Sequence, residues 1–143
     1  MSEANKEVVL KFIQAMGTND PDTAATCLAQ DAYTLAKGFS KFAGVRHYET
    51  IVETIGSFAE VIPTGLRPKV LTVTAEGDRV AVEFEGNALC SNGEPYCNEY
   101  CMVFTMQDGK IKQVNEYFCT ILAERVLWPL AEEWMAKRAA QAQ

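Results

Sequence analysis

Several features that would identify particular classes of protein are absent from this sequence of 143 residues. No apolar run approaches the roughly 20 residues that a membrane-spanning helix needs. The start of the sequence, residues 1–7, is polar and lacks the apolar core of a signal peptide, so we expect a cytoplasmic protein that does not associate with membranes. Lys and Arg total 13 against 19 Asp and Glu, and the net charge of −6 argues against a nucleic-acid partner, because phosphate binding needs a basic surface.

Signals for metals and cofactors are also missing. The sequence has neither a glycine-rich phosphate loop nor a dinucleotide-binding fingerprint. Its five cysteines include no Cys-x-x-Cys pair, and we expect reduced thiols. Cys97 and Cys101 with His47, the one histidine, lack the spacing and the second ligand pair of a zinc site. We therefore expect no metal and no cofactor.

The length and the apolar content of 48% fit one soluble domain over residues 1–143. Asp20-Pro21 is a helix-start signal, because Asp caps a helix and Pro is tolerated at its first position. Short strands are expected at 31–36 and 69–75. Apolar residues at helical spacing predict helices over 3–16, 21–29, 45–61 and 130–141, with a further short helix from Cys119 to Leu127.

The strongest pattern lies between Asp78 and Cys119. Asn92-Gly93 and Asp108-Gly109 separate apolar runs and are typical hairpin turns, because both tolerate positive φ. They predict three consecutive antiparallel strands over 79–90, 96–106 and 110–118. With the helices before them, these strands indicate an α+β fold: a curved antiparallel sheet wrapped as a cone around N-terminal helices, with a C-terminal helix. The mouth of such a cone is the default place for a small ligand.

The first turn sets which side chains share a face of the sheet. A two-residue turn at Asn92-Gly93 pairs Glu85 with Tyr100, Glu83 with Met102, and Asn87 with Asn98. These polar pairs would line a pocket, and the opposite face, with the remaining apolar strand residues, would be dry. Since side chains alternate, a slip of one residue would invert this assignment.

The second turn leaves two alternatives for Glu116. A two-residue turn at Asp108-Gly109 puts Tyr117 opposite Tyr100 and sends Glu116 to the dry face. A three-residue loop over 107–109 puts Glu116 opposite Tyr100, in one row with Glu85. Burying a lone Glu without a partner is costly, which favours the second arrangement.

Such a row would suit acid–base chemistry. Two carboxylates in an apolar pocket do not both ionise easily, so one pKa rises and the acid and base roles separate. The hypothesis assigns Glu116 as base, Glu85 as acid and Tyr100 as hydrogen-bond donor to a developing oxyanion. His47 is a further acid–base candidate. The alternative is that the acids are solvated on an open strand face.

Candidate substrate-binding residues surround this row. The loop over 37–44 carries two aromatic side chains that either pack on the core edge or form a lid over the pocket. An apolar stripe in the last helix either packs on the body of the domain or forms a dimer contact or a cap over the pocket. The expected binding residues are Glu83, Asn98, Asn87, Met102, Phe39, Phe42, Tyr48 and Phe12.

Residues 78–85, 104–111 and 115–119 resemble the nuclear-transport-factor-two-like superfamily. Within it, the chain is similar to SnoaL-like polyketide cyclases, limonene-epoxide-hydrolase-like proteins and ketosteroid-isomerase-like proteins. Glu85 and Glu116 match the two acidic positions of the epoxide hydrolases, whose arginine is here Glu83. Where SnoaL-like cyclases often carry an acid–base Asp, this chain has Cys119.

The resemblance implies an apolar small-molecule ligand and a homodimer formed through the outer face of the sheet. We expect a cofactor-independent acid–base enzyme of the isomerase, cyclase, dehydratase or epoxide-hydrolase type. Its substrate would be an apolar molecule such as a polyketide, a terpenoid or a steroid-like compound. The alternative is a non-catalytic binding or dimerisation module of the same fold, because fold alone does not fix function.

Overall fold

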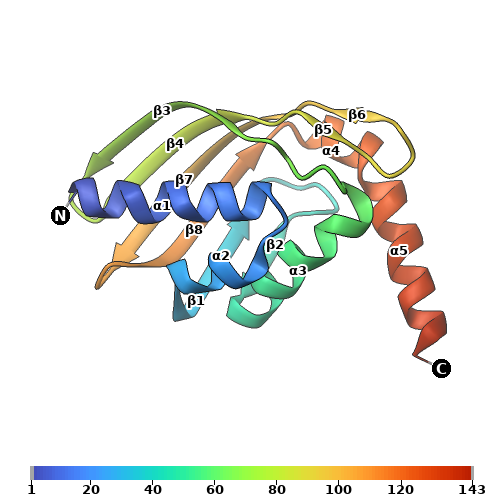
Figure 1. Ribbon diagram of the computed structural model, residues 1–143, viewed down its shortest axis with the longest axis horizontal. Helices are drawn as coiled ribbons and strands as arrows, with labels where there is room; N and C mark the ends of the chain where they lie inside the picture. Colours follow the sequence, from blue (N-terminus) through green and yellow to red (C-terminus); the bar gives the residue numbers. More distant parts are fainter. Residues whose placement is uncertain (1, 143) are drawn as a thin grey trace.

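The computed structural model describes residues 2–142 and has the expected α+β architecture. Three helices lie against one face of a curved sheet, and two more stand at one end of it (Figure 1). The elements in chain order are α1 (Ser2–Gly17), α2 (Pro21–Cys27), β1 (Leu28–Ala36), β2 (Gly44–His47), α3 (Tyr48–Val61), β3 (Lys69–Glu76), β4 (Arg79–Glu85), β5 (Ala88–Leu89), β6 (Pro95–Tyr96), β7 (Glu99–Gln107), β8 (Lys110–Phe118), α4 (Thr120–Val126) and α5 (Trp128–Gln141).

The main sheet has six strands in the order β2-β1-β8-β7-β4-β3. All neighbours pair antiparallel except β1 and β8, which run parallel, so the sheet is mixed rather than wholly antiparallel as expected. The parallel pair brings the first strand of the chain beside the last one. Residues from both ends of the sequence therefore meet on the concave face that the helices cover.

Most predicted helices are confirmed, and the start of α2 shows why. The Asp20 carboxylate accepts a hydrogen bond from the Thr23 amide at 3.1 Å, and Pro21 occupies the first helical position. The helix predicted from residue 45 begins only at Tyr48. Residues Gly44–His47 instead pair with β1 as an edge strand, so that Arg46 lies opposite Thr34.

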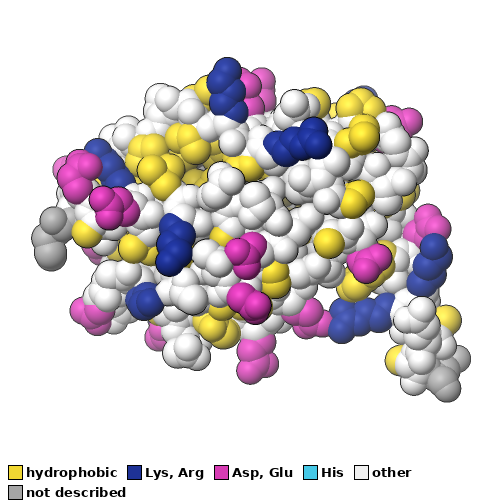
Figure 2. Space-filling view, viewed as in Figure 1, with side chains coloured by type: hydrophobic (Ala, Val, Ile, Leu, Met, Phe, Trp, Pro, Cys, Tyr) yellow, Lys and Arg dark blue, Asp and Glu magenta, His cyan; other side chains and the backbone are white. Residues whose placement is uncertain are grey.

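The hydrophobic core fills the space between the helices and the inner face of the sheet. From α1 it takes Val9, Phe12 and Ile13, and from the strands chiefly Val80, Val82, Phe84, Met102, Phe104, Ile111 and Val114. The outside carries scattered acidic and basic side chains, with hydrophobic groups gathered most clearly above α1 beside β3 and β4 (Figure 2). None of the helices in the described range is long and apolar enough to cross a lipid bilayer.

The first hairpin loop has three residues, and the two-residue turn predicted there is wrong. The Cys90 amide donates to the Glu94 carbonyl at 2.8 Å, and the Gly93 amide donates to the Cys90 carbonyl at 2.9 Å. Gly93 has a φ of 86°, the left-handed conformation that closes a three-residue hairpin loop. The pairing of every residue in β4 and β7 is therefore displaced by one position.

This displacement overturns the expected polar face. Phe84 lies opposite Tyr100, and Glu83 and Glu85 lie opposite Cys101 and Glu99. Because side chains alternate, Glu83 and Glu85 are on the outer face, where both are exposed. The expected row of Glu85, Tyr100 and Glu116 does not form.

The second hairpin has the two-residue turn of the first alternative but the predicted pairing of neither, since Phe118 lies opposite Tyr100. Asp108 and Gly109 form a two-residue turn with φ values of 52° and 76°, as a type I′ turn requires. A β-bulge then leaves Lys112 without a partner in β7 and shifts the remaining pairs. Glu116 consequently lies opposite Met102, on the face that the helices cover.

Candidate functional site

A cavity of about 320 Å³ lies between the helices and the inner face of the sheet. Its walls come from α1, α3, α4, α5 and the strands, and they are mainly aliphatic and aromatic. Its polar contributors are few, as is usual for small-molecule sites. Among the described lining residues they are Thr34, Arg46, Thr54, Ser57, Tyr96, Tyr100, Glu116 and the two tryptophans Trp128 and Trp134.

Glu116 is the one carboxylate among the described lining residues. Burial raises the pKa of its carboxyl above the ordinary value, although the charge of Arg46 and a hydrogen bond with Thr34 act in the opposite direction. The side chain keeps some accessible surface, which is consistent with its position on the cavity wall. The carboxyl is therefore screened from bulk water but reachable by a molecule inside the cavity.

The strand register explains why these three side chains meet. Arg46 of β2 lies directly across from Thr34 of β1, and Glu116 of β8 lies across from Ala36, two residues further along β1. Residues two apart in a strand share a face, so Arg46, Thr34 and Glu116 all project toward the helices. We call this set the acid cluster.

A second polar group is built around Tyr96. The Tyr100 hydroxyl donates to the Tyr96 hydroxyl at 2.9 Å, and Nδ2 of Asn98 donates to the same oxygen at 2.8 Å. Tyr96 thus accepts two hydrogen bonds and retains its own proton for a further acceptor. Burial raises the pKa of both phenols, which keeps them protonated. We call Tyr96, Tyr100 and Asn98 the phenol cluster.

Asn98 fixes the phenol cluster to the backbone. Its side chain is buried, and its Oδ1 accepts from the amides of Glu99 at 2.8 Å and Cys119 at 3.3 Å. Its Nδ2 also donates to the Cys119 carbonyl at 3.0 Å. The Asn98 side chain therefore joins the start of β7 to the end of β8 while it positions Tyr96.

The cavity brings together five of the residues that the sequence suggested. Glu116, Tyr100, Met102, Phe12 and Phe42 all line it. The Phe42 ring packs edge-on against Trp128, with centroids 5.3 Å apart. The Tyr100 ring stacks on Phe84 at 4.8 Å. Asn98 stands behind the wall and contacts the cavity through Tyr96.

The other suggested residues lie elsewhere. Glu83, Glu85 and Asn87 are exposed because of the displaced register, and the Asn87 side chain accepts a hydrogen bond from the Cys97 thiol. His47 is exposed beside Tyr33 on the outer face, with ring centroids 6.3 Å apart, because the edge strand β2 turns it away from the cavity.

Two of the aromatic candidates are also outside the cavity. The Phe39 side chain is fully exposed at the tip of its loop, so only Phe42 of that loop packs inward. Tyr48, at the start of α3, lines a separate shallow depression that includes Lys110.

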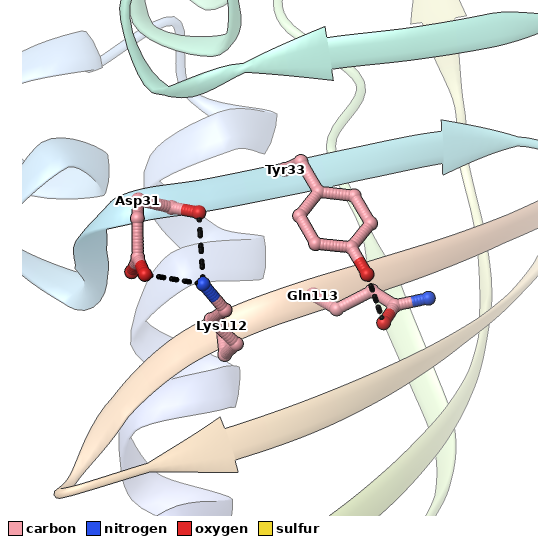
Figure 3. Close-up of polar contacts among 4 residues, drawn as sticks. All are labelled: Asp31, Tyr33, Lys112 and Gln113. Atoms are coloured by element: carbon pink, nitrogen blue, oxygen red, sulfur yellow. Dashed lines mark hydrogen bonds and ion pairs between the residues drawn. The ribbon is translucent and has the colours of Figure 1, made fainter.

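The outer face of the sheet carries its own polar contacts, across the parallel strands (Figure 3). The Tyr33 hydroxyl donates to Oε1 of Gln113 at 2.7 Å. Lys112, the bulged residue, forms an ion pair with Asp31 and lowers the pKa of its carboxyl. These contacts join β1 to β8 and support the register that places the acid cluster.

Sequence reasoning missed Arg46, Thr34 and Tyr96. Recognition of residues 44–47 as a strand would have placed Arg46 inward by alternation. Thr34 would have followed from its position opposite Arg46. Tyr96 begins the predicted second strand, but its face depends on the loop before it. Across residues 2–142, no group of three or more His, Cys, Asp or Glu side chains could hold a metal ion.

Comparisons with known proteins agree with this architecture. The SnoaL-like domain pattern matches residues 9–114, which is most of the chain. No curated protein sequence matches. Similar solved structures include Bal32a from a soil-derived mobile gene cassette, which has 22% identity and a TM-score of 0.77 over 88% of this chain and 98% of the other.

Two further structures share the fold. TerC, co-crystallised with polyporic acid, has 19% identity and a TM-score of 0.74 over 87% of this chain and 98% of its own. An LEH-like epoxide hydrolase of M. tuberculosis has 18% identity and a TM-score of 0.71 over 95% of this chain and 98% of its own. At these identities the likeness concerns the fold. With the family match it establishes that the chain belongs to the SnoaL-like domain family and has the nuclear-transport-factor-two-like fold.

Proposed function

We propose that this chain is a cofactor-independent acid–base enzyme that acts on an apolar small organic molecule in the cavity, with Glu116 as the group that takes up and returns a proton. The observation that carries this proposal is a carboxyl of raised pKa on the wall of an apolar cavity. A carboxylate is a better general base when its pKa approaches neutrality, and burial is the usual way to raise it.

The two polar clusters suit the two ends of such a reaction. Ionised Glu116 removes a proton from a carbon beside a carbonyl group, and negative charge then develops on the carbonyl oxygen. The Tyr96 hydroxyl can donate a hydrogen bond to that oxygen. Both acceptor positions of the Tyr96 hydroxyl are already occupied by Tyr100 and Asn98, so its own proton is free to point at the ligand. Isomerisation, cyclisation and dehydration can all begin with this step. With water in place of the carbon acid, Glu116 would open an epoxide.

The roles differ from those inferred from the sequence. Glu85 is on the outer face and cannot share a proton with Glu116. The Tyr100 hydroxyl donates its hydrogen bond to Tyr96, so Tyr96 is the group that would donate to the oxyanion of the substrate. Glu116 thus acts alone as acid and base, with Thr34 and Arg46 stabilising its ionised form.

A non-catalytic binding module is the second candidate. It is favoured by the nearly apolar lining, in which Glu116 has no second carboxylate beside it among the described residues. The named neighbours leave both functions open for this chain, since one is called an epoxide hydrolase and another was co-crystallised with polyporic acid.

A homodimer in the cytoplasm belongs to the same proposal. The outer face of the sheet carries the exposed apolar side chains Tyr117 and Val45. Such side chains on a broad sheet face are suited to contact with a second copy. Sedimentation of the purified protein would test this, and a mass of one chain at micromolar concentration would contradict it.

Deuterium exchange tests the catalytic proposal without knowledge of the natural substrate. The bicyclic ketone α-tetralone carries exchangeable hydrogens beside its carbonyl group, and NMR in heavy water follows their loss. The protein is expected to accelerate this exchange, and Glu116→Gln to abolish the acceleration. Glu85→Gln is the matched control and should retain it. Binding of the ketone with equal exchange rates for the protein and Glu116→Gln would support the binding module instead.

A further inference from the structure

We propose that the cavity selects ligands in which an apolar body carries one anionic oxygen group, and that Arg46 is the specificity-determining residue that binds this group. The inference rests on the proposed use of the cavity for a small organic ligand, but it does not require catalysis. It assigns a substrate class, acidic apolar molecules such as aryl carboxylates, sulfonates or acidic enols.

Arg46 has a distinctive position on the cavity wall. It is the one Lys or Arg among the described residues that line the cavity. Edge strand β2 holds it, and its pairing with Thr34 directs the side chain toward the helices. The neighbours Val45 and His47 alternate to the outside and are exposed. The chain thus places a single positive charge in a mainly apolar chamber that also holds the Glu116 carboxyl.

Arg46 uses few of its hydrogen-bond donors within the protein. Its Nη2 donates to the Phe42 carbonyl at 3.1 Å, which anchors the guanidinium to the loop between β1 and β2. Among residues 2–142 no carboxylate forms an ion pair with Arg46. A guanidinium has five N–H groups in a planar fork. Most of the fork therefore remains available for a carboxylate or sulfonate, which it binds in bidentate fashion.

The guanidinium fork of Arg46 lies beside Glu116 and Thr34. Glu116 is close enough for Arg46 to influence its charge, and Thr34 lies between them in the sheet. An anion at Arg46 would therefore lie next to the Glu116 carboxyl, with the rest of the molecule against the aromatic walls. A charge pair in such a low-dielectric chamber is stronger than in water. A neutral molecule of the same shape does not form this charge pair with Arg46.

The rival explanation is that Arg46 only balances the charge of Glu116. The two explanations differ in the effect of Arg46 on ligands of different charge. A balancing role predicts that its removal changes the binding of charged and neutral ligands alike. A binding role predicts a loss restricted to anions, and a gain for anions when Glu116 is neutralised.

Two fluorescent probes with similar apolar bodies make this distinction: anilinonaphthalene sulfonate, which is anionic, and phenylnaphthylamine, which is neutral. Fluorescence titration would measure the dissociation constants of both for the protein and its variants. We expect Arg46→Met to weaken sulfonate binding by at least about tenfold, as for other buried charge pairs, and to leave the neutral probe within about twofold. Glu116→Gln should tighten sulfonate binding, since it removes the competing negative charge.

Further variants keep the test decisive if Arg46→Met does not fold. Arg46→Lys retains the charge but not the fork, and should give an intermediate loss for the sulfonate. The double variant Arg46→Met with Glu116→Gln removes both charges together, and should still bind the sulfonate more weakly than Glu116→Gln does. Equal losses for both probes, no loss for either, or failure of the protein itself to bind the sulfonate would overturn the inference.

The same measurements separate this inference from the proposed enzymatic function. If Glu116→Gln abolishes α-tetralone exchange but Arg46→Met does not weaken sulfonate binding, the inference about Arg46 is refuted and the proposed enzymatic function stands. Sulfonate binding that depends on Arg46, with no catalysed exchange, would refute the enzyme and leave an acid-binding cavity.

Discussion

Tyr100 of β7 lies directly across from Phe84 of β4, and their rings stack with centroids 4.8 Å apart and planes 6° apart. This contact depends on the three-residue loop after Cys90, since any other loop length would move Tyr100 away from Phe84. It also supports the wall on which the phenol cluster stands. The stack therefore links the hairpin register to the geometry of the cavity.

Replacement of Phe84 by Ala should destabilise the protein by about 3–5 kcal/mol, because it removes a fully buried ring and leaves a void beside Tyr100. Urea unfolding followed by circular dichroism measures this change. Its matched control is Glu85→Ala, one residue along the same strand but on the exposed face, which should change stability by no more than about 0.5 kcal/mol. Comparable losses for both variants would contradict the register.

Replacement of Glu116 by Gln should alter the pH dependence of stability in a defined direction. Burial raises the pKa of Glu116 in the folded protein, so the folded state binds more protons than the unfolded state between the unfolded and folded pKa values. The stability that Glu116 contributes through this proton binding is therefore fully present below the unfolded pKa of about 4.3, and it is lost as the pH rises through the folded pKa. The stability of Glu116→Gln relative to the natural protein should accordingly increase with pH.

Urea unfolding of both proteins from about pH 4 to pH 8 measures this difference. The interval begins near the ordinary Glu pKa of about 4.3 and extends upward in the direction of the shift. Asp20→Asn is an informative control, because a hydrogen bond from Thr23 lowers the pKa of Asp20. Its sign is opposite and its window lies lower: the stability of that variant relative to the natural protein falls as the pH rises toward the ordinary Asp pKa of about 3.9, and should change little between about pH 5 and pH 8. A flat or falling difference for Glu116→Gln would show that the carboxyl is not desolvated.

Local signals predicted most of the fold. Helix caps, apolar periodicity and turn residues are encoded within a few neighbouring positions, as Asp20-Pro21 and Asp108-Gly109 illustrate. The parallel pairing of β1 and β8 joins residues about eighty positions apart, and no local pattern in either strand specifies it. The edge strand β2 was missed for a similar reason, since its four residues form a strand only through pairing with β1.

The candidate site was less predictable, because its composition depends on register. The tripeptide Ser91-Asn92-Gly93 can close either a two-residue or a three-residue loop, and that choice decides whether Glu85 or Phe84 lies opposite Tyr100 on the inner face of the sheet. The bulge at Lys112 decides the same question for Glu116. The sequence pattern also predicted separate polar and dry faces of the sheet. The structure instead places the cavity within the apolar face, where Glu116 stands among core residues.

Replacement of Tyr96 by Phe should cost more stability than replacement of Tyr100 by Phe. Tyr96 is the acceptor for both Tyr100 and Asn98, so its loss leaves buried donors without their partner, which costs about 1–3 kcal/mol. Loss of the Tyr100 hydroxyl removes one donor and leaves Tyr96 bonded to Asn98, at about 0.5–1.5 kcal/mol. Thermal and urea unfolding of both variants would measure the order. Equal losses, or a larger loss for Tyr100→Phe, would contradict the assignment of Tyr96 as the central acceptor.

Helix α5 should open locally more easily than the rest of the protein. None of its residues is buried, although Trp128, Trp134 and Met135 line the cavity. Nη2 of Arg138 binds Oε1 of Glu53 in α3 at 2.6 Å, and its guanidinium lies 5.3 Å from the centre of the Trp134 ring (Figure 1 shows α5 extending from the body). This exposed attachment is worth no more than about 1 kcal/mol, so α5 is held mainly by its contacts at the cavity.

Replacement of Arg138 by Gln should therefore leave global stability within about 1 kcal/mol but accelerate amide hydrogen exchange throughout α5. Mass spectrometry of peptides from the exchanged protein measures the exchange of each segment separately. Exchange in α1 and β7 should be unchanged. Lys137→Gln is the matched control, since it breaks only the pair with Glu133 within the same helix. If the attachment to α3 holds α5 over the cavity, the α3 amides near Glu53 should also exchange faster in Arg138→Gln. In Lys137→Gln their exchange should be unchanged. Uniform protection in both variants would show that the tryptophan contacts alone keep α5 in place.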